Sequence, residues 1–240
     1  WWMSCALFGA FPYWLSGTCD TFCDSYFESM SGLTTTGASI FSDIEALPQG
    51  ILFWRSMSQW LGGMGIVVFF VAVLPTIGVG GHKLFSAEAP DLTTDKIKPR
   101  IAQTAKILWV IYLSLTAILI PLLWFGGMEF FDAICHAFTT ISTGGFSTKN
   151  LSIAAFDSLF IEIVIMVFVF IAGCNFILYY QLVTGKFKKV LANSEIRFYV
   201  SLMLCAICLV TLALFFFDSN SYSGGVKDHK YDSVGGSLRY

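Results

Sequence analysis

Long runs without a single charged residue constrain the fold of this chain more than any other feature. Residues 107–125 and 198–217 contain no Asp, Glu, Lys or Arg, and residues 159–180 contain only Glu162, close to the start of the run. A helix needs about 20 predominantly apolar residues to cross the hydrocarbon layer of a bilayer. The sequence therefore predicts three membrane-spanning helices in these runs.

Two further segments complete the predicted set of spans. Residues 51–74 are polar in their first half, and Arg55 lies close enough to the end of this run to extend its guanidinium group into water. Residues 1–15 match part of a fifth span. The composition agrees, because 56% of the residues are hydrophobic and only 12% are charged, whereas about 25% of a soluble domain is charged. We predict an all-α integral membrane protein in contact with lipid, without the basic patch that nucleic-acid binding requires.

Two shorter apolar segments, residues 21–33 and 129–141, lie between the spans. Each is too short to cross the membrane and has the length of a re-entrant half-helix. Backbone that stops being helical at membrane depth leaves amide and carbonyl groups without partners, so it is tolerated only inside protein or beside a water-filled cavity. We predict two half-helices that enter the membrane and end there in a non-helical loop.

Similar residues follow both half-helices. The two loops are rich in glycine and in small residues with hydroxyl groups: Thr34, Thr35, Thr36 and Gly37 in the first, and Ser142, Thr143, Gly144 and Gly145 in the second. Such an internal repeat indicates that the chain uses a unit of helix, half-helix, loop and helix twice. The span at residues 198–217 would open a third unit.

The loops have the composition of an ion-coordinating backbone. A ring of backbone carbonyls replaces the water of a dehydrated cation, and glycine reaches the backbone angles that turn successive carbonyls the same way. We predict that Gly37 and Gly145 form equivalent bends. The expected carbonyl ligands of the ion are Thr35, Thr36, Gly37, Thr143, Gly144 and Gly145, with Thr34 and Ser142 as outlying candidates. We assign no catalytic residue and expect no organic cofactor.

The distribution of Lys and Arg gives the predicted domains and orientation. Most basic residues lie in the connections 76–106 and 184–197, which we place in the cytoplasm. These connections separate a first pore repeat with a truncated first helix (residues 1–75), a second pore repeat (107–183) and the beginning of a third, incomplete repeat (198–240). Both loops then face the outside of the cell.

The loops and the helix after the first of them resemble the Trk/Ktr/HKT superfamily of potassium transporters, and most of all the membrane subunits of bacterial Trk systems. Three further stretches carry the resemblance: Trp54-Arg55-Ser56, Gln59-Trp60-Leu61-Gly62-Gly63-Met64-Gly65 and Phe85-Ser86-Ala87-Glu88. The resemblance extends over the whole chain. Members of this superfamily arrange four such units around one pore, with one filter glycine each, so this chain would supply about two of the four loops.

The resemblance implies a function, partners and a location. It implies potassium uptake through the filter across the inner membrane of a bacterium, either down the electrochemical gradient or as a symporter with a coupled ion. It also implies a homodimer and a cytosolic nucleotide-binding regulatory subunit that docks on the basic connections. Gly37 stands where sodium transporters of the plant branch have serine, so potassium is favoured. A sodium- and potassium-permeable transporter is the alternative.

Other residues allow different interpretations. An integral-membrane enzyme would use Glu28, His136 and Glu162 as acid and base groups. Packing at the half-helices or bonding to backbone fits Glu28 and His136 better, and a place at the start of a helix fits Glu162. Gly62, Gly63 and Gly65 would allow helices to approach closely, with a hinge as the alternative role. A third alternative is an inert fragment, because two loops cannot close a ring of four.

The cysteines give no metal signature. Cys205 and Cys208 lie inside an apolar run, where we expect packing in a core rather than redox or zinc chemistry. Cys19 and Cys23 lie on the predicted outer side. One turn of helix seldom gives the geometry of a disulfide, so we expect both thiols to be free.

Overall fold

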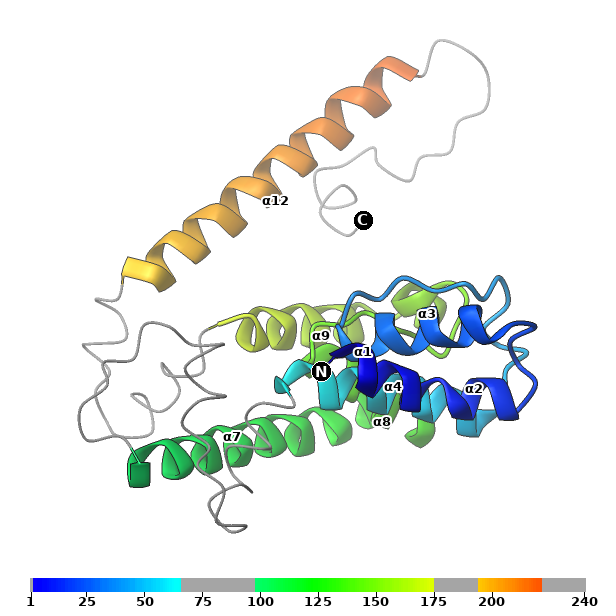
Figure 1. Ribbon diagram of the computed structural model, residues 1–240. Coiled ribbons are helices and arrows are strands. Elements are labelled where there is room, and N and C mark those ends of the chain that lie inside the picture. Colours follow the sequence, from blue (N-terminus) through cyan, green and yellow to red (C-terminus); the bar gives the residue numbers. More distant parts are fainter. Residues whose placement is uncertain (1, 66–97, 175–193, 222–240) are drawn as a thin grey trace. The chain divides into compact units, whose positions relative to one another are not determined.

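The computed structural model describes residues 2–65, 98–174 and 194–221 of the 240-residue chain. Within these residues the only regular secondary structure is helical (Figure 1), which confirms the predicted all-helical fold for this part of the chain. The chain divides into two compact units, Trp1–Tyr180 and Gln181–Tyr240. The first unit holds nearly all of the two predicted pore repeats, and the second holds the helix predicted to open a third.

The first repeat begins with two short helices instead of one. α1 (Trp2–Gly9) and α2 (Phe11–Leu15) are separated at Ala10. Pro12 lies in the first turn of α2, and proline has no amide hydrogen to donate to the preceding turn. The amide of Ala10 still donates to a carbonyl of α1. The predicted span over residues 1–15 is therefore helical but interrupted.

The two half-helices lie within one residue of their predicted positions. α3 (Phe22–Leu33) and α8 (Phe130–Ile141) have 12 residues each. Thr21 caps α3, because its hydroxyl oxygen accepts a hydrogen bond of 3.1 Å from the amide of Asp24. Asp24 and Asp132 lie in the first turns of the two half-helices, where a carboxylate interacts favourably with the helix dipole.

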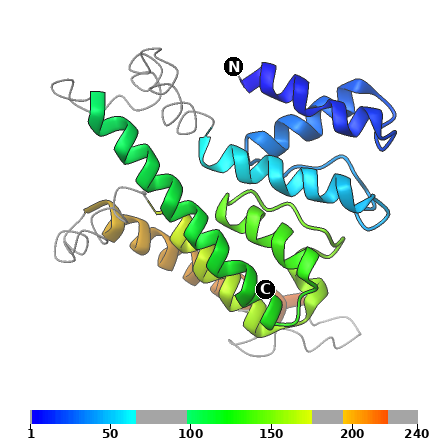
Figure 2. The same ribbon diagram turned by 90° about the horizontal axis from the view of Figure 1, so that it is seen from below.

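The helix α4 (Gln49–Gly63), drawn in cyan in Figure 2, lies between the two half-helices and packs against both. Two glycines at its end make this close packing possible. A side chain on Gly62 would overlap the backbone carbonyl of Leu33 at the end of α3, and a side chain on Gly63 would overlap Ser142, just after α8. The predicted role in close helix packing is confirmed for Gly62 and Gly63 but not for Gly65, where a side chain would meet no described atom within 4 Å.

The interior between α3 and α4 is polar. The buried polar side chains of these two helices are Ser25, Glu28, Ser29, Ser31, Arg55, Ser56, Ser58 and Gln59. Buried polar groups are stable only when they form hydrogen bonds. The first repeat therefore depends on specific polar pairs as well as on apolar area.

The second repeat is built around an apolar core. α7 (Lys98–Phe125), α8 and α9 (Leu159–Ala172) pack together, and a short 3-10 helix, η1 (Ser152–Phe156), precedes α9. A cluster of buried hydrophobic side chains joins the three long helices: Tyr112, Leu119, Leu123, Ala133, Ala137, Ile141, Ile161, Ile165 and Phe168. This core fixes the position of α8, whose end leads into the second loop.

The structure describes only part of two predicted spans. α4 ends at Gly63 and is capped by Met64, within the predicted span 51–74. α9 ends at Ala172 and is capped by Gly173, within the predicted span 159–180. Residues 66–74 and 175–180 of these spans lie outside the described ranges, as do most of the two basic connections.

Within the described parts of the chain, two helices are long and apolar enough to cross a membrane. α7 and α12 (Ser194–Ser221) have 28 residues each and contain the apolar windows Leu108–Phe125 and Ile196–Ala213. The predicted spans at residues 107–125 and 198–217 lie within these helices.

The cysteines differ in their surroundings. Cys19 is buried, Cys23 is exposed, and both are free thiols in the structure. Cys205 and Cys208 are exposed on α12. Their predicted packing in a core is wrong for this unit, because the side chains of an apolar helix can also be exposed on its outer surface.

Candidate functional site

Both half-helices end in the same hydrogen-bonded motif. After α3, the amide of Thr35 donates to the carbonyl of Gly32 and the amide of Thr36 donates to that of Ser31, both at 3.0 Å. This pair of bonds defines a Schellman motif, in which the residue after the helix cap adopts the left-handed conformation. Thr35 occupies that position, with a φ of 54°.

The second loop repeats this geometry. The amide of Thr143 donates to Thr140 at 3.0 Å, the amide of Gly144 donates to Thr139 at 2.9 Å, and Thr143 has the same φ of 54°. Glycine usually fills this position, and a β-branched residue there is an outlier that costs about 1–3 kcal/mol. The same left-handed turn at a threonine therefore recurs in both repeats. This recurrence is visible in the sequence, where Thr35 aligns with Thr143.

The glycines after these threonines bend as predicted. The φ angle is 77° at Gly37 and 81° at Gly145. A side chain on Gly37 would overlap the carbonyl oxygen of Gly144, so the two loops lie side by side at this point. A side chain on Gly145 would meet no described atom within 4 Å. Gly145 faces a cavity of about 210 Å³, which Thr143 and His136 also line.

Gln59 of α4 holds the second loop on both sides of Gly145. Its Nε2 donates to the carbonyl of Gly144 at 2.9 Å, and the amide of Phe146 donates to its Oε1 at 3.1 Å. The Gln59 side chain is fully buried. The carbonyl of Gly144, one of the predicted ligands, therefore uses one of its lone pairs to accept a bond from Gln59.

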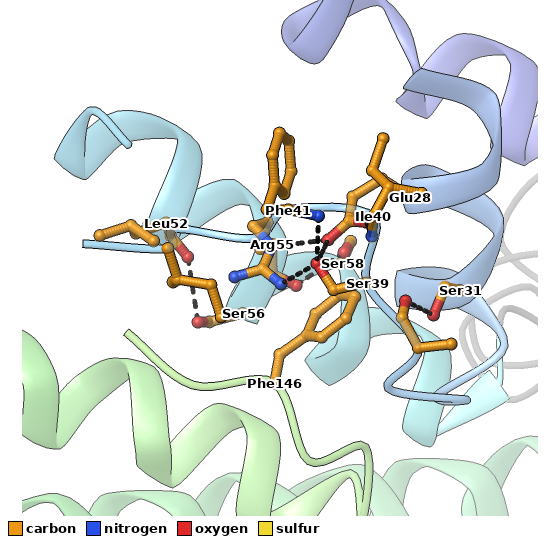
Figure 3. A network of polar contacts seen from close by, with 12 residues as sticks. Glu28, Ser31, Ser39, Ile40, Phe41, Leu52, Arg55, Ser56, Ser58 and Phe146 are labelled. Carbon is orange, nitrogen blue, oxygen red and sulfur yellow. Dashed lines mark hydrogen bonds and ion pairs between the residues drawn. The ribbon is translucent and has the colours of Figure 1, made fainter. Parts of the chain in front are cut away.

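A buried ion pair joins α3 to α4 (Figure 3). Arg55 Nε donates to Glu28 Oε1 at 2.8 Å, and the two side chains are 1% and 0% exposed. Glu28 also accepts hydrogen bonds from Ser39 Oγ at 2.9 Å and from the amide of Ile40 at 3.1 Å. The carboxylate thus has three donors, which offset the cost of removing it from water.

Arg55 also reaches the second loop. Its Nη1 donates to the carbonyl of Ser147 at 3.3 Å, and its guanidinium lies 4.2 Å from the centre of the Phe146 ring. The expectation that Arg55 extends into water is therefore wrong. The reason is that Glu28 supplies a buried carboxylate, and a buried charge is favourable only with such a partner.

His136 occupies in the second repeat the position that Glu28 has in the first. Its Nδ1 lies 2.8 Å from the carbonyl oxygen of Asp132, and its Nε2 lies 3.0 Å from Ser147 Oγ. Both side chains bond to backbone, as predicted: Glu28 to the amide of Ile40, and His136 to the carbonyl of Asp132. The ion pair of Glu28 with Arg55 was not predicted. Glu162 lies in the first turn of α9. Among the described residues, no group of three or more His, Cys, Asp or Glu side chains is placed to hold a metal ion.

Asn150 connects the outer ends of the two loops. Its Oδ1 accepts a hydrogen bond from the amide of Ile44 at 2.7 Å, and its Nδ2 donates to Asp43 Oδ1 at 2.9 Å. Its own amide donates to Glu45 Oε1 at 3.1 Å. The bond from Asn150 holds the pKa of the exposed Asp43 carboxyl below its usual value. Acidic residues of the first loop therefore help to join the two repeats.

Sequence reasoning missed Arg55 and Gln59 as parts of this site. They lie four residues apart in a run predicted to span the membrane, so they share one face of a helix. Polar residues in such a run usually face the protein interior or a water-filled cavity. The spacing of these two polar residues within an apolar run could therefore have identified them from the sequence.

Comparison with known proteins agrees with this arrangement. Residues 1–217 match the TrkH family, described as a cation transport protein. The chain is 47% identical over 221 residues to the Trk system potassium uptake protein TrkH of Escherichia coli K12, a match that covers 91% of this chain and 45% of the relative. It is 38% identical over 213 residues to the Trk system potassium uptake protein TrkG of the same strain, with coverage of 88% and 44%.

A solved structure is also similar. The crystal structure of the potassium transporter TrkH from Vibrio parahaemolyticus matches with a TM-score of 0.75 and 36% identity, over 99% of this chain and 46% of that one. This chain therefore spans less than half the length of the relatives it matches. The names of these relatives describe transport proteins, which does not fit the alternative of a membrane enzyme. The match over residues 1–217 shows that the chain belongs to the TrkH family of cation transport proteins.

Proposed function

We propose that this chain contributes two filter loops to a pathway for potassium uptake across the bacterial inner membrane. The observation that carries the proposal is the repeated turn after the half-helices. Thr35 and Thr143 are left-handed in both loops, and Gly37 and Gly145 follow two residues later with positive φ. Relatives that match most of this chain are named as potassium uptake proteins.

The proposed ligands are backbone carbonyls, which bind a dehydrated cation without the net charge that would trap it. The half-helices α3 and α8 direct their partially negative C-terminal ends toward the loops. Gly144 contributes less than the other ligands, because Gln59 already donates to its carbonyl. Thr34 and Ser142 stay outlying candidates, because they precede the left-handed turns at Thr35 and Thr143. The carbonyls that carry the proposal are those of Thr35, Thr36, Gly37, Thr143 and Gly145.

Replacing the filter glycines by alanine tests the proposal. In Gly37→Ala the new methyl group would overlap the Gly144 carbonyl, so both loops must shift. In Gly145→Ala the methyl group meets no described neighbour, so only the cost of positive φ applies, about 1–2 kcal/mol. We expect the ratio of potassium to sodium permeability to fall in both variants, about tenfold or more for Gly37→Ala and less for Gly145→Ala.

The measurement uses a transporter that contains this chain, in proteoliposomes and in potassium-limited growth of a transport-deficient strain. Gly17→Ala is a matched control, because Gly17 has a φ of 68° and also meets no described neighbour, but lies outside both filter loops. It should transport like the unaltered protein. Unchanged selectivity in both filter variants would contradict the proposal, as would an equal loss in Gly17→Ala.

Orientation and partners belong to the same proposal. We place the filter loops outside and the basic connections in the cytoplasm, and we infer a homodimer that binds a cytosolic nucleotide-binding regulatory subunit. An impermeant maleimide should label the exposed Cys23 in intact spheroplasts and should fail to label a Cys23→Ser variant at that position. Native mass spectrometry of the purified transporter would reveal one copy if the dimer is wrong.

The driving force is tested separately. Potassium uptake into proteoliposomes that stays the same with and without an imposed proton or sodium gradient indicates flow down the potassium gradient alone. Uptake that requires one of these gradients indicates a symporter. Sodium entry at a rate similar to that of potassium would favour the sodium- and potassium-permeable alternative.

A further inference from the structure

We infer that Gln59 orients the carbonyls of the second loop and so sets how well the pathway distinguishes potassium from sodium. The inference rests on the proposed function and adds a positioning residue on α4, outside both loops.

Two hydrogen bonds carry the inference. Gln59 Nε2 donates to the Gly144 carbonyl at 2.9 Å, and the Phe146 amide donates to Gln59 Oε1 at 3.1 Å. A single amide side chain therefore holds both residues that flank Gly145. The side chain is 0% exposed, so water does not compete for these bonds, and they are stronger than bonds at a surface.

The direction of the Gly145 carbonyl follows from these bonds. The peptide between Gly145 and Phe146 is planar and trans, so its carbonyl and its amide hydrogen point in opposite directions. The Phe146 amide hydrogen points toward Gln59, and the Gly145 carbonyl therefore points away from it. The Gly144 carbonyl points toward Gln59 instead. Gln59 thus turns the Gly144 carbonyl toward itself and leaves the Gly145 carbonyl to act as a ligand of the ion.

The same contact explains why position 144 is glycine. A side chain on Gly144 would overlap the amide group of Gln59. The equivalent residue of the first loop is Thr36, which has a side chain where the second loop has none. When α4 and α9 are aligned on their first residues, Gln59 falls opposite Val169, which can form neither bond. Gln59 is therefore a specific feature of the contact between the first and second repeats.

Substitution of Gln59 tests the inference in a transporter that contains this chain. Gln59→Met removes both hydrogen bonds and keeps the length and approximate volume of the side chain. Gln59→Glu keeps the acceptor for the Phe146 amide and loses the donor to Gly144. We expect the permeability ratio of potassium to sodium to fall about tenfold in Gln59→Met, since loss of one buried hydrogen bond changes an equilibrium by about this factor. The fall should be at least as large in Gln59→Glu, because a carboxylate oxygen in place of Nε2 would be a buried charge facing the Gly144 carbonyl oxygen.

The matched control is Ser56→Ala in the same helix. Ser56 is also buried, and its Oγ donates to the carbonyl of Leu52 within α4. The permeability ratio should be unchanged in this variant. A fall in Ser56→Ala as large as that in the Gln59 variants would overturn the inference, because it would attribute the effect to α4 in general.

Gly145→Ala serves as the reference for the filter itself. If it changes the ratio and both Gln59 variants do not, the inference is wrong and the proposed function stands. If neither Gly145→Ala nor either Gln59 variant changes the ratio of potassium to sodium permeability, both the inference and the proposed function are wrong. Slower uptake at an unchanged ratio in the Gln59 variants would indicate structural support only and would overturn the inference. If Gln59→Met does not reach the membrane, Gln59→Glu decides by the same criterion.

Discussion

The buried pair of Arg55 and Glu28 gives the sharpest prediction for stability. Arg55→Met removes the cation and leaves Glu28 with only the neutral donors Ser39 and Ile40. Glu28→Gln removes the anion and leaves the guanidinium uncompensated at 1% exposure. Removing one partner of a buried ion pair costs about 3–5 kcal/mol. We expect each single change to lower the unfolding free energy by this amount.

The double variant separates the pair from its surroundings. It leaves no unpaired charge, so its loss of unfolding free energy should be smaller than the sum of the two single losses by about 2 kcal/mol or more. The assay is unfolding of the purified transporter in mixed micelles by increasing detergent, followed by circular dichroism. If the two single losses of unfolding free energy add up to the loss in the double variant within about 0.5 kcal/mol, the conclusion that Arg55 and Glu28 form a buried pair is refuted.

A partly exposed ion pair in the second repeat supplies the control. Lys149 Nζ lies 3.6 Å from Asp132 Oδ2, and the Lys149 side chain is 35% exposed. Lys149→Met should cost only about 0–1 kcal/mol, as is usual for pairs open to solvent. Salt should weaken this effect and leave the Arg55 effect nearly unchanged, because screening acts mainly on exposed charges. Equal salt dependence for the two pairs would contradict the burial of Arg55.

Other perturbations have equally definite outcomes. Thr143→Gly should relieve the left-handed strain, raising the unfolding free energy by about 1 kcal/mol while lowering potassium selectivity; thermal unfolding and permeability ratios check the two effects. Gly62→Ala should push α4 away from the Leu33 carbonyl and lower the melting temperature. The hydrogen bond that lowers the pKa of Asp43 stabilises the fold above the usual Asp pKa of about 3.9, and this contribution is lost as pH falls through the lowered pKa. Asn150→Ala should remove that part of the pH dependence of the melting temperature.

The half-helices could be predicted because consecutive residues encode them. Their length, their position between longer apolar runs and the recurrence of Thr, Ser and Gly after each were all visible in the sequence. α3 and α8 accordingly begin and end within one residue of the predicted segments. The break at Ala10 was also readable, since Pro12 removes an amide from the predicted span.

The polar contacts of α4 could not be predicted in the same way, because they join residues far apart in the chain. Gln59 bonds to Gly144 and Phe146, which follow it by 85 and 87 positions. Arg55 finds Glu28 on another helix. The spacing of Arg55 and Gln59 identifies a polar helix face, but only the fold decides whether that face meets water, lipid or a second loop.

α4 and α9 follow the loops of the first and second repeat, but they carry different side chains at equivalent positions. Where α4 carries Arg55 and Gln59, α9 carries Ile165 and Val169. The two similar repeats are therefore not interchangeable parts. In a chimera built from two copies of the first repeat, the second Arg55 would bring its own Glu28, but Thr36 would replace Gly144 beside Gln59. A side chain at that position overlaps the Gln59 amide, so the packing of the two copies should fail at this contact.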